Sequence, residues 1–212
     1  MAAPPEMLTV PMEVDPSIFD QAEMNFLLTG LIVPRAIGWI STISRSGIAN
    51  LSPFSFFTVA STAPPHLLFS SASDAKDSVV NARETGQFVA NITDQSLVDV
   101  VVGSSAAVAP DVDEFELVGL ERAPSVRVAP PRVARAKAHL ECEVRQIVPV
   151  GTSSLVIGEV VHLHCDPSIW AAGRVQARLL DPLARLGGSN YARLGEIFSR
   201  PAPTIDERSR GS

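Results

Sequence analysis

Hydrophobic and polar residues alternate in short runs along most of this 212-residue chain, and clusters of turn residues separate the runs. This spacing is typical of β-strands. A turn at residues 45–47 joins two early runs, and residues 149–153 join the last two, which we expect to pair antiparallel. The predicted strands span residues 36–44, 48–60, 66–71, 88–92, 134–148 and 155–164.

Two other segments have helical spacing. Residues 76–85 precede Gly86, the residue type that most often ends a helix, and the apolar residues between Leu97 and Val102 form a stripe. A third helix is expected near residues 191–198. The candidate N-caps are Ser73 or Asp74 for the first helix and Asp94 or Ser96 for the second.

The elements sum to a mainly β fold with two or three helices, and short strands with regular turns favour a closed or partly closed barrel. No G-x-G-x-x-G follows a strand, so a Rossmann domain is not expected. Residues 103–131 are rich in loop formers, with Phe115 and Leu117 as expected anchors. We expect a single domain over about residues 20–200, an extended proline-rich arm at 1–18 and a frayed tail at 202–212.

The composition argues against several classes of protein. A net charge of −6 disfavours a general nucleic-acid binder. No apolar run reaches the ~20 residues of a membrane helix, and the N-terminus does not resemble a secretory signal, so a cytoplasmic protein is expected. Cys142 and Cys165 lie in β-like runs and are expected to be buried free thiols, because a bridge between them needs an oxidising compartment.

Hydroxyl groups and one lysine gather where the first helix begins. A helix N-terminus offers unpaired N–H groups, serine hydroxyls donate to phosphate oxygens, and Lys76 adds a positive charge. This combination predicts a phosphate site. The alternative is a capped helix with a solvated lysine, which needs the same residues and which composition alone favours. The residues concerned are Ser70, Ser71, Lys76, Asp77 and Ser78.

A second candidate region lies in the predicted strand at residues 48–60. Pro53 cannot donate to a sheet ladder, so it marks a bulge or an unpaired edge. Backbone groups freed there can bind the polar edge of a heteroaromatic ring, with Phe54 or Phe56 against its apolar part. A core strand with aromatic packing is the alternative. The residues of this region are Asn50, Ser52, Pro53, Phe54 and Ser55.

Other polar residues lie nearby in the sequence. Arg35 pairs either with a phosphate or with an acidic neighbour, and Ser41 and Thr42 lie on the adjoining strand. His162 and His164 share a strand face, but no spacing supports a metal site. There is no G-x-S-x-G, no H-E-x-x-H and no evident nucleophile. A bound cofactor would explain this absence, because the cofactor then supplies the reactivity.

Three blocks, PRAIGWISTISRSGIANLSPFSFF, KDSVVNARETGQFVAN and LARLGGSNYARLGEIF, resemble the flavin reductase-like family of FMN-binding split-barrel proteins. The resemblance covers residues 25–200 and implies a six-stranded Greek-key split barrel. It also implies a homodimer that binds FMN near the subunit interface.

The resemblance implies roles for the candidate residues. The segment from Asn50 to Ser55 would meet the flavin ring and ribityl chain, and the serines and Lys76 would surround the phosphate. The family usually has threonine at the position of Ser78, and the hydroxyl is kept. Tyr191 would cover the ring or the nicotinamide pocket, with Arg185 positioning that segment.

The implied activity is hydride transfer from NADH or NADPH to FMN, with a partner monooxygenase as one acceptor of reduced flavin. A flavoredoxin-type electron carrier and a non-redox protein on the same barrel are the alternatives. The sequence contains no signature that selects NADH over NADPH.

Overall fold

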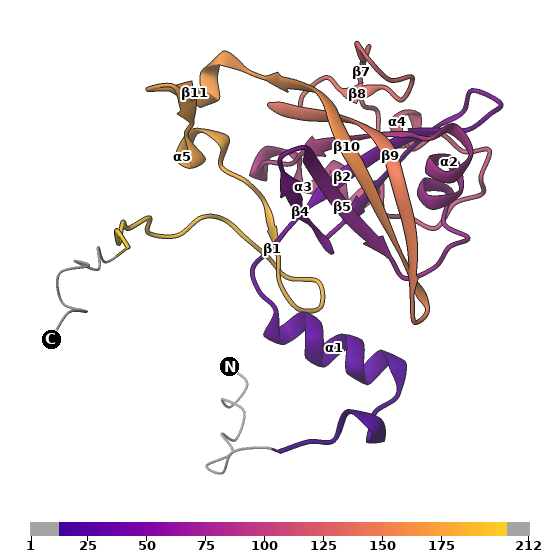
Figure 1. Ribbon diagram of the computed structural model, residues 1–212, viewed down its shortest axis with the longest axis vertical. Helices are drawn as coiled ribbons and strands as arrows, with labels where there is room; N and C mark the ends of the chain where they lie inside the picture. Colours follow the sequence, from indigo (N-terminus) through magenta and orange to yellow (C-terminus); the bar gives the residue numbers. More distant parts are fainter. Residues whose placement is uncertain (1–12, 203–212) are drawn as a thin grey trace, which may run out of the picture.

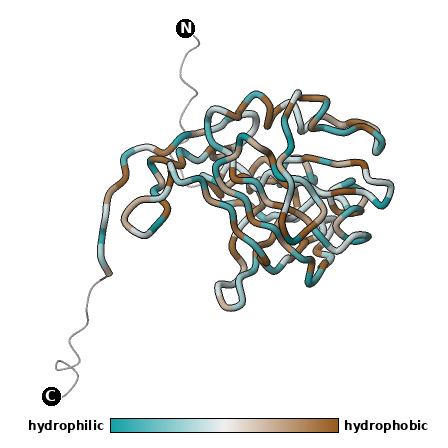
Figure 2. The backbone as a smooth tube through the Cα atoms, turned by 90° about the horizontal axis from the view of Figure 1, so that it is seen from above, coloured by the Kyte–Doolittle hydropathy of each residue, from teal (hydrophilic) through white to brown (hydrophobic). Residues whose placement is uncertain are grey.

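The computed structural model describes residues 13–202, in which a seven-stranded antiparallel sheet curls into a barrel (Figure 1). Each of the six predicted strand segments contributes to the sheet, although one of them is divided into two strands, and the fold is mainly β as expected. Figure 2 shows hydrophobic and hydrophilic stretches alternating along the barrel. In spatial order the strands are β3 (Ala49–Phe54), β2 (Gly38–Ile43), β6 (Gln87–Ile92), β9 (Ala138–Val150), β10 (Ser153–Cys165), β5 (Pro65–Ser71) and β4 (Phe57–Thr62).

The two edge strands, β3 and β4, follow one another in the chain. The prediction of one long strand over residues 48–60 is therefore wrong, because the chain leaves the first edge at Ser55 and joins the opposite edge at Phe57. Between them, the carbonyl of Phe56 accepts a bond from the Ser70 N–H at 2.8 Å. Pro53 pairs with Trp39 on the edge strand, in agreement with the predicted edge.

Two hydrophobic cores lie on the two faces of the sheet. The inner core fills the barrel around Phe69 and Phe88. The outer core packs Trp39 and Phe115 between the sheet and the short helices α3 (Val98–Gly103) and α4 (Glu114–Leu117). Leu117 is half exposed, so only Phe115 is an anchor of this loop-rich region.

The first predicted helix is α2 (Asp77–Thr85), and Gly86 ends it with φ of 72° as expected. The predicted caps are wrong, because its N-cap position is Lys76 and no side chain within the described residues caps it. The second predicted helix comprises the 3-10 turn η2 (Gln95–Leu97) followed by α3. Asp94 begins it by accepting the Ser96 N–H at 2.8 Å.

Short elements make up the rest. The helix expected near residues 191–198 is wrong, because Tyr191 pairs with Arg185 in a hairpin and the chain is irregular beyond it. Of the expected arm and tail, residues 1–12 and 203–212 lie outside the described residues. The short elements are η1 (Pro16–Ile18), β1 (Arg35–Ala36), β7 (Arg122–Ala123), β8 (Arg132–Val133), η3 (Pro167–Ile169), β11 (Trp170–Ala171), β12 (Arg174–Val175), α5 (Ala177–Leu180), β13 (Ala184–Arg185) and β14 (Tyr191–Ala192).

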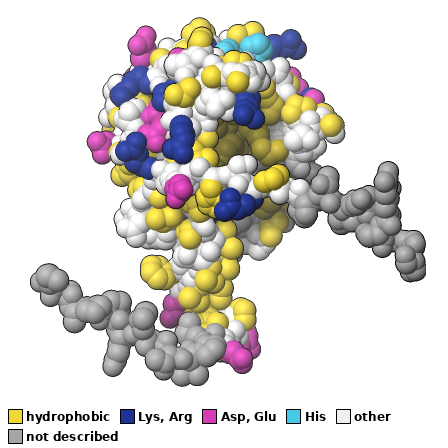
Figure 3. All heavy atoms as spheres, turned by 90° about the vertical axis from the view of Figure 1, so that its left-hand side faces the viewer, with side chains coloured by type: hydrophobic (Ala, Val, Ile, Leu, Met, Phe, Trp, Pro, Cys, Tyr) yellow, Lys and Arg dark blue, Asp and Glu magenta, His cyan; other side chains and the backbone are white. Residues whose placement is uncertain are grey.

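One helix was not predicted from the sequence. Helix α1 (Gln21–Leu31) begins with a capping box in which Asp20 and Glu23 bond each other's backbone N–H. It projects away from the barrel (Figure 1), and none of its residues is buried. Figure 3 shows hydrophobic side chains on the part of the molecule that projects below the barrel. In α1, Phe26 and Leu31 are 68% and 75% exposed.

Both cysteines are free, as expected, but only Cys142 is buried. Cys165 is exposed because it is the last residue of β10, at the end of the sheet. Within residues 13–202 no group of metal-ligating side chains is arranged to hold an ion. None of the helices in that range is both long and apolar enough to span a bilayer.

Candidate functional site

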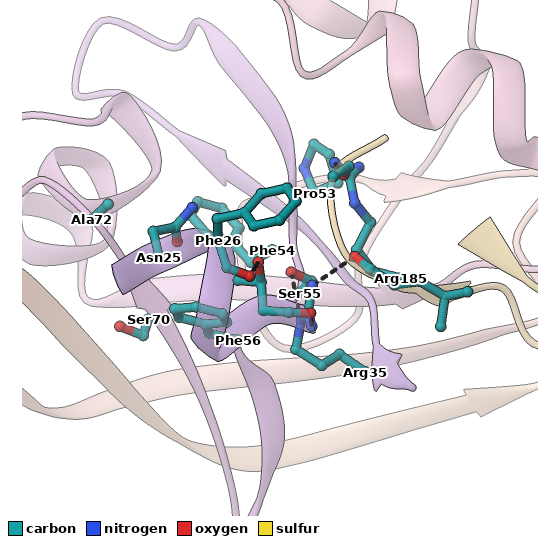
Figure 4. A pocket seen from close by; sticks show the side chains of 13 residues that line it. Asn25, Phe26, Arg35, Pro53, Phe54, Ser55, Phe56, Ser70, Ala72 and Arg185 are labelled. Carbon is teal, nitrogen blue, oxygen red and sulfur yellow. Dashed lines mark hydrogen bonds between the residues drawn. The ribbon is translucent and has the colours of Figure 1, made fainter. Parts of the chain in front are cut away.

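Three hollows meet at Ser55, where the chain crosses from β3 to β4. The first, of about 300 Å³, extends between a serine end and an arginine end (Figure 4). We call it the first cavity. Two arginines and no acidic residue are among its described lining residues, although the whole chain is acidic. It is lined by Asn25, Phe26, Thr29, Arg35, Pro53, Phe54, Ser55, Phe56, Ser70, Ala72, Arg185, Leu186 and Gly188.

Arg35 forms hydrogen bonds to several of the segments that line this cavity. Its guanidinium donates to the carbonyls of Thr29 and Ile32 at 2.6 Å each, to the carbonyl of Leu186 at 2.9 Å, and weakly to the Ser55 hydroxyl at 3.4 Å. These bonds use four of its five N–H groups. Burial and the charge of Arg185 lower the pKa of Arg35. The sequence predicted a phosphate or an acidic partner, but the side chain is bound to backbone carbonyls.

Arg185 is bound more loosely. It donates to the Tyr191 hydroxyl and to the Gly188 carbonyl, and its guanidinium lies 4.6 Å from the centre of the Tyr191 ring. Both partners belong to its own hairpin, so three of its N–H groups have no partner among the described residues. Arg185 is therefore a cation available to a ligand, whereas Arg35 is largely committed to the fold.

The opposite end of the first cavity is formed by residues that come shortly before α2 in the chain. Ser70 and Ala72 lie there, on the side away from the two arginines (Figure 4). Lys76 is exposed a few residues further on, at the helix start that no described side chain caps. Unpaired N–H groups and the positive end of the helix dipole make such a start favourable for an anion.

Three of the predicted site residues, Thr42, Asn50 and Ser78, are instead buried in a closed network. Asn50 accepts bonds from the hydroxyls of Ser78 at 2.7 Å and Thr42 at 3.3 Å, and its amide donates to Glu114 at 2.9 Å. The other Glu114 oxygen accepts the Leu51 N–H at 3.0 Å. Burial raises the pKa of Glu114 despite these bonds. These groups satisfy one another inside the protein.

Ser41 is also internal, because its hydroxyl donates to the Pro131 carbonyl at 2.5 Å. Ser71 bonds the Ser73 carbonyl at 2.8 Å and is buried beside the first cavity. Ser52 and Asp77 are partly exposed and line none of the hollows. The structure thus brings together, from the predicted set, Arg35, Pro53, Phe54, Ser55 and Ser70 in the first cavity and Tyr191 in a neighbouring one.

Sequence reasoning missed the contribution of α1, whose Asn25, Phe26 and Thr29 line the first cavity. The Asp20-x-x-Glu23 capping box before an apolar run was the signal that predicts this helix. Nothing in the sequence pattern indicated that its side chains reach the cavity.

A separate polar cluster lies on β9 and β10. The buried carboxylate of Glu141 accepts the N–H groups of Val126 and Arg127 and a bond from His164 at 2.5 Å. Burial opposes its ionisation, but these donors outweigh burial and lower the pKa of Glu141. Burial lowers the pKa of His139 to about 4, so this histidine is neutral at pH 7.

Comparisons with known proteins agree with the resemblance seen in the sequence. The chain matches the flavin reductase like domain over residues 30–177. The structure is similar to nitrilotriacetate monooxygenase component B from Bacillus cereus, with 32% identity, a TM-score of 0.87, and coverage of 91% of this chain and 100% of that one. The chain belongs to the flavin reductase-like family.

Two further solved structures resemble this flavin reductase-like protein. The 2-nitrobenzoate 2-nitroreductase of Pseudomonas fluorescens has 28% identity and a TM-score of 0.85, over 92% of this chain and 98% of that one. A flavin reductase with a split-barrel domain from Shewanella frigidimarina has 20% identity and a TM-score of 0.81, over 91% and 100%. The latter establishes the split-barrel fold.

The first cavity has the donors that a flavin mononucleotide requires. Ser55 accepts a bond from Arg35 and therefore keeps its own O–H free to donate. Two arginines lie at one end of the cavity, and beyond the other end the chain continues to Lys76 and to a helix start that no described side chain caps. The residues present fit a long ligand with a polar ring and a phosphate.

Proposed function

We propose that this protein is an FMN-dependent flavin reductase that uses NADH or NADPH as the electron donor. The observation that carries the proposal is the first cavity, with Ser70 at one end, a few residues before a helix start that no described side chain caps, and Arg185 at the other. The absence of an acid, base or nucleophile motif in the sequence agrees with chemistry supplied by a cofactor.

The phosphate would lie toward Ser70, Ser71 and Lys76, beside the N–H groups of Asp77 and Ser78 at the start of α2. Ser71 and Ser78 have their hydroxyls committed inside the protein, so Ser70 and Lys76 are the side chains that would contact it. The ring would lie along Pro53, Phe54 and Ser55. When bound, the flavin accepts hydride and passes its electrons on.

The role of the arginine end follows from charge. Reduced flavin carries negative charge, and a preorganised cation near that charge stabilises it at little reorganisation cost. Arg185, with three N–H groups that no described residue accepts, would supply this stabilisation. Arg35 would hold Arg185's hairpin, α1 and Ser55 in the geometry that the ring needs.

The protein would function as a homodimer. Helix α1 exposes Phe26, Leu28 and Leu31, and the second of the three hollows, of about 550 Å³, has mostly apolar walls that include Leu28 and Phe56. Exposed apolar patches of this kind mark interaction surfaces. A second copy covering them would also cover Phe26, which lines the first cavity.

A monooxygenase is the proposed consumer of the reduced flavin. The similarity to a monooxygenase component B at 32% identity supports this choice. We place the reaction in the cytoplasm, where NADH and NADPH are available.

Spectroscopy of the purified protein tests the proposal. We expect a flavin absorption band, or quenching of FMN fluorescence on titration, and oxidation of NADH or NADPH with added FMN. Flavin that stays bound while neither nucleotide is consumed would instead identify an electron carrier. A colourless protein that leaves FMN fluorescence unchanged would refute flavin binding.

A further inference from the structure

The third hollow at Ser55 lies behind a wall that it shares with the first cavity. Pro53, Ser55 and Arg185 line both. We call it the second cavity. Its volume of about 280 Å³ is at the lower limit of the roughly 300–1,000 Å³ of ordinary ligand pockets. Because the two cavities have nearly equal volumes, their linings and not their sizes distinguish the ligands that suit them.

The second cavity has an apolar floor and a polar rim. Ile37 and Val101, with 5% and 0% exposure, form the floor. Ser105 and Tyr191 complete the rim with the shared Ser55. The Ser105 hydroxyl donates to the Val102 carbonyl at 2.6 Å, and the Tyr191 hydroxyl accepts from Arg185. Such a lining suits an apolar body with polar substituents at one edge.

Charge at the rim comes from Arg185, the one charged group among the described residues that line the second cavity. The Tyr191 ring and the Gly188 carbonyl hold its guanidinium in place. Three N–H groups remain for a ligand, and a planar guanidinium binds carboxylates through two parallel bonds. A cation fixed in this way selects an anion over a neutral molecule of the same shape.

We propose that the second cavity binds a small organic anion with an apolar body, of the aromatic carboxylate class, and that Arg185 recognises its charge. Because the cavities share a wall, the anion would lie beside the flavin ring. The inference rests on the proposed function for this adjacency alone, and the binding itself is independent of flavin.

Benzoate is the probe for the first test, with benzamide as its neutral counterpart. Each is titrated into the full-length protein, with and without FMN, and binding is followed by saturation-transfer NMR and calorimetry. We expect saturable benzoate binding in both conditions and at least about tenfold weaker benzamide binding, because benzamide has no negative charge and offers one acceptor oxygen where the carboxylate offers two. Equal affinities of the two probes would overturn the assignment to Arg185.

Two variants localise the binding. Arg185→Gln should weaken benzoate binding at least about tenfold, whereas Arg200→Gln, which changes an arginine of the same C-terminal segment outside both cavities, should leave it unchanged. Ser105→Trp fills the second cavity from an exposed position that does not line the first. It should abolish benzoate binding and spare FMN binding, with the fold checked by circular dichroism.

The outcomes separate this inference from the proposed function. Benzoate binding that depends on Arg185, in a protein that does not bind FMN, would support the second cavity and refute the flavin proposal. FMN binding without benzoate binding would support the flavin proposal and refute the second cavity as an anion site. Benzoate binding that survives both Arg185→Gln and Ser105→Trp lies elsewhere and refutes the inference.

Discussion

Strand β3 carries polar residues into two different surroundings. At Asn50 the side chain joins Thr42, Ser78 and Glu114 in a buried network whose members satisfy one another. At Ser55, just beyond the strand, Arg35 and Arg185 face open cavities and leave donors unused. The comparison teaches that the type of a residue does not identify a ligand site. The number of its donors left unpaired does.

The physical difference lies in what the neighbouring elements bring. Helix α4 delivers a carboxylate, Glu114, which accepts from the Asn50 amide and the Leu51 N–H. Around Ser55, backbone carbonyls of helix α1 and of the β13–β14 hairpin accept bonds from Arg35. The same hairpin contributes the cation Arg185, and no acidic residue is among the described residues that line the first cavity. The first region is therefore complete without a ligand, whereas the second has a surplus of donors.

The largest expected effect is on stability and comes from a substitution that breaks the closed network around Asn50. Glu114→Leu leaves the Asn50 amide and the Leu51 N–H buried without an acceptor, so we expect a loss of about 3 kcal/mol of unfolding free energy. Urea denaturation measures it, and Glu116→Leu on the same helix is the exposed control. A loss below about 1 kcal/mol would show that the network contributes little.

Acid should weaken the fold through His139, far from the open cavities. Its folded pKa of about 4 lies below its ordinary value of 6.5, so the unfolded chain binds a proton that the folded chain does not. Stability is then complete above pH 6.5 and falls between 6.5 and 4 by on the order of 2–3 kcal/mol. His139→Gln should flatten this part of the pH profile, whereas His66→Gln should not.

At the open site, removing a donor should reduce ligand affinity and spare stability. Lys76→Ala should weaken FMN binding by about 1.5–3 kcal/mol, the contribution of one charge-assisted contact. Lys137→Ala is the matched control, because Lys137 is the other lysine of the chain and pairs with Asp94 away from the first cavity. A dissociation constant for FMN that Lys76→Ala leaves unchanged would remove Lys76 from the site.

The smallest effects sharpen the comparison between serines. Ser78→Ala should cost about 1 kcal/mol of stability, because it removes a buried bond to Asn50. Ser70→Ala should leave stability within about 0.5 kcal/mol and weaken FMN binding. Parallel denaturation and FMN titration of both variants provide the check. If the two serines behave alike, the division into a closed and an open region is wrong.

The sequence predicted the individual strands well, because alternation along a strand is a local property. It located Pro53 on an edge and Gly86 at a helix end for the same reason. The division of residues 48–60 at Ser55 was not predictable, since it depends on the closure of the barrel rather than on any neighbour in the chain. The supposed helix near residues 191–198 failed because pairing with β13 outweighed its weak local preference.

The sequence by itself determined the family and every strand segment except the division of residues 48–60, and it identified the segment around Ser55 as a candidate site. Only the tertiary structure decided which polar groups are free, because Ser78 meets Asn50, and Arg35 meets Leu186, across large separations in the chain. Hydrogen-bond saturation is a property of three-dimensional neighbours. A pattern of residue types along one chain cannot specify it.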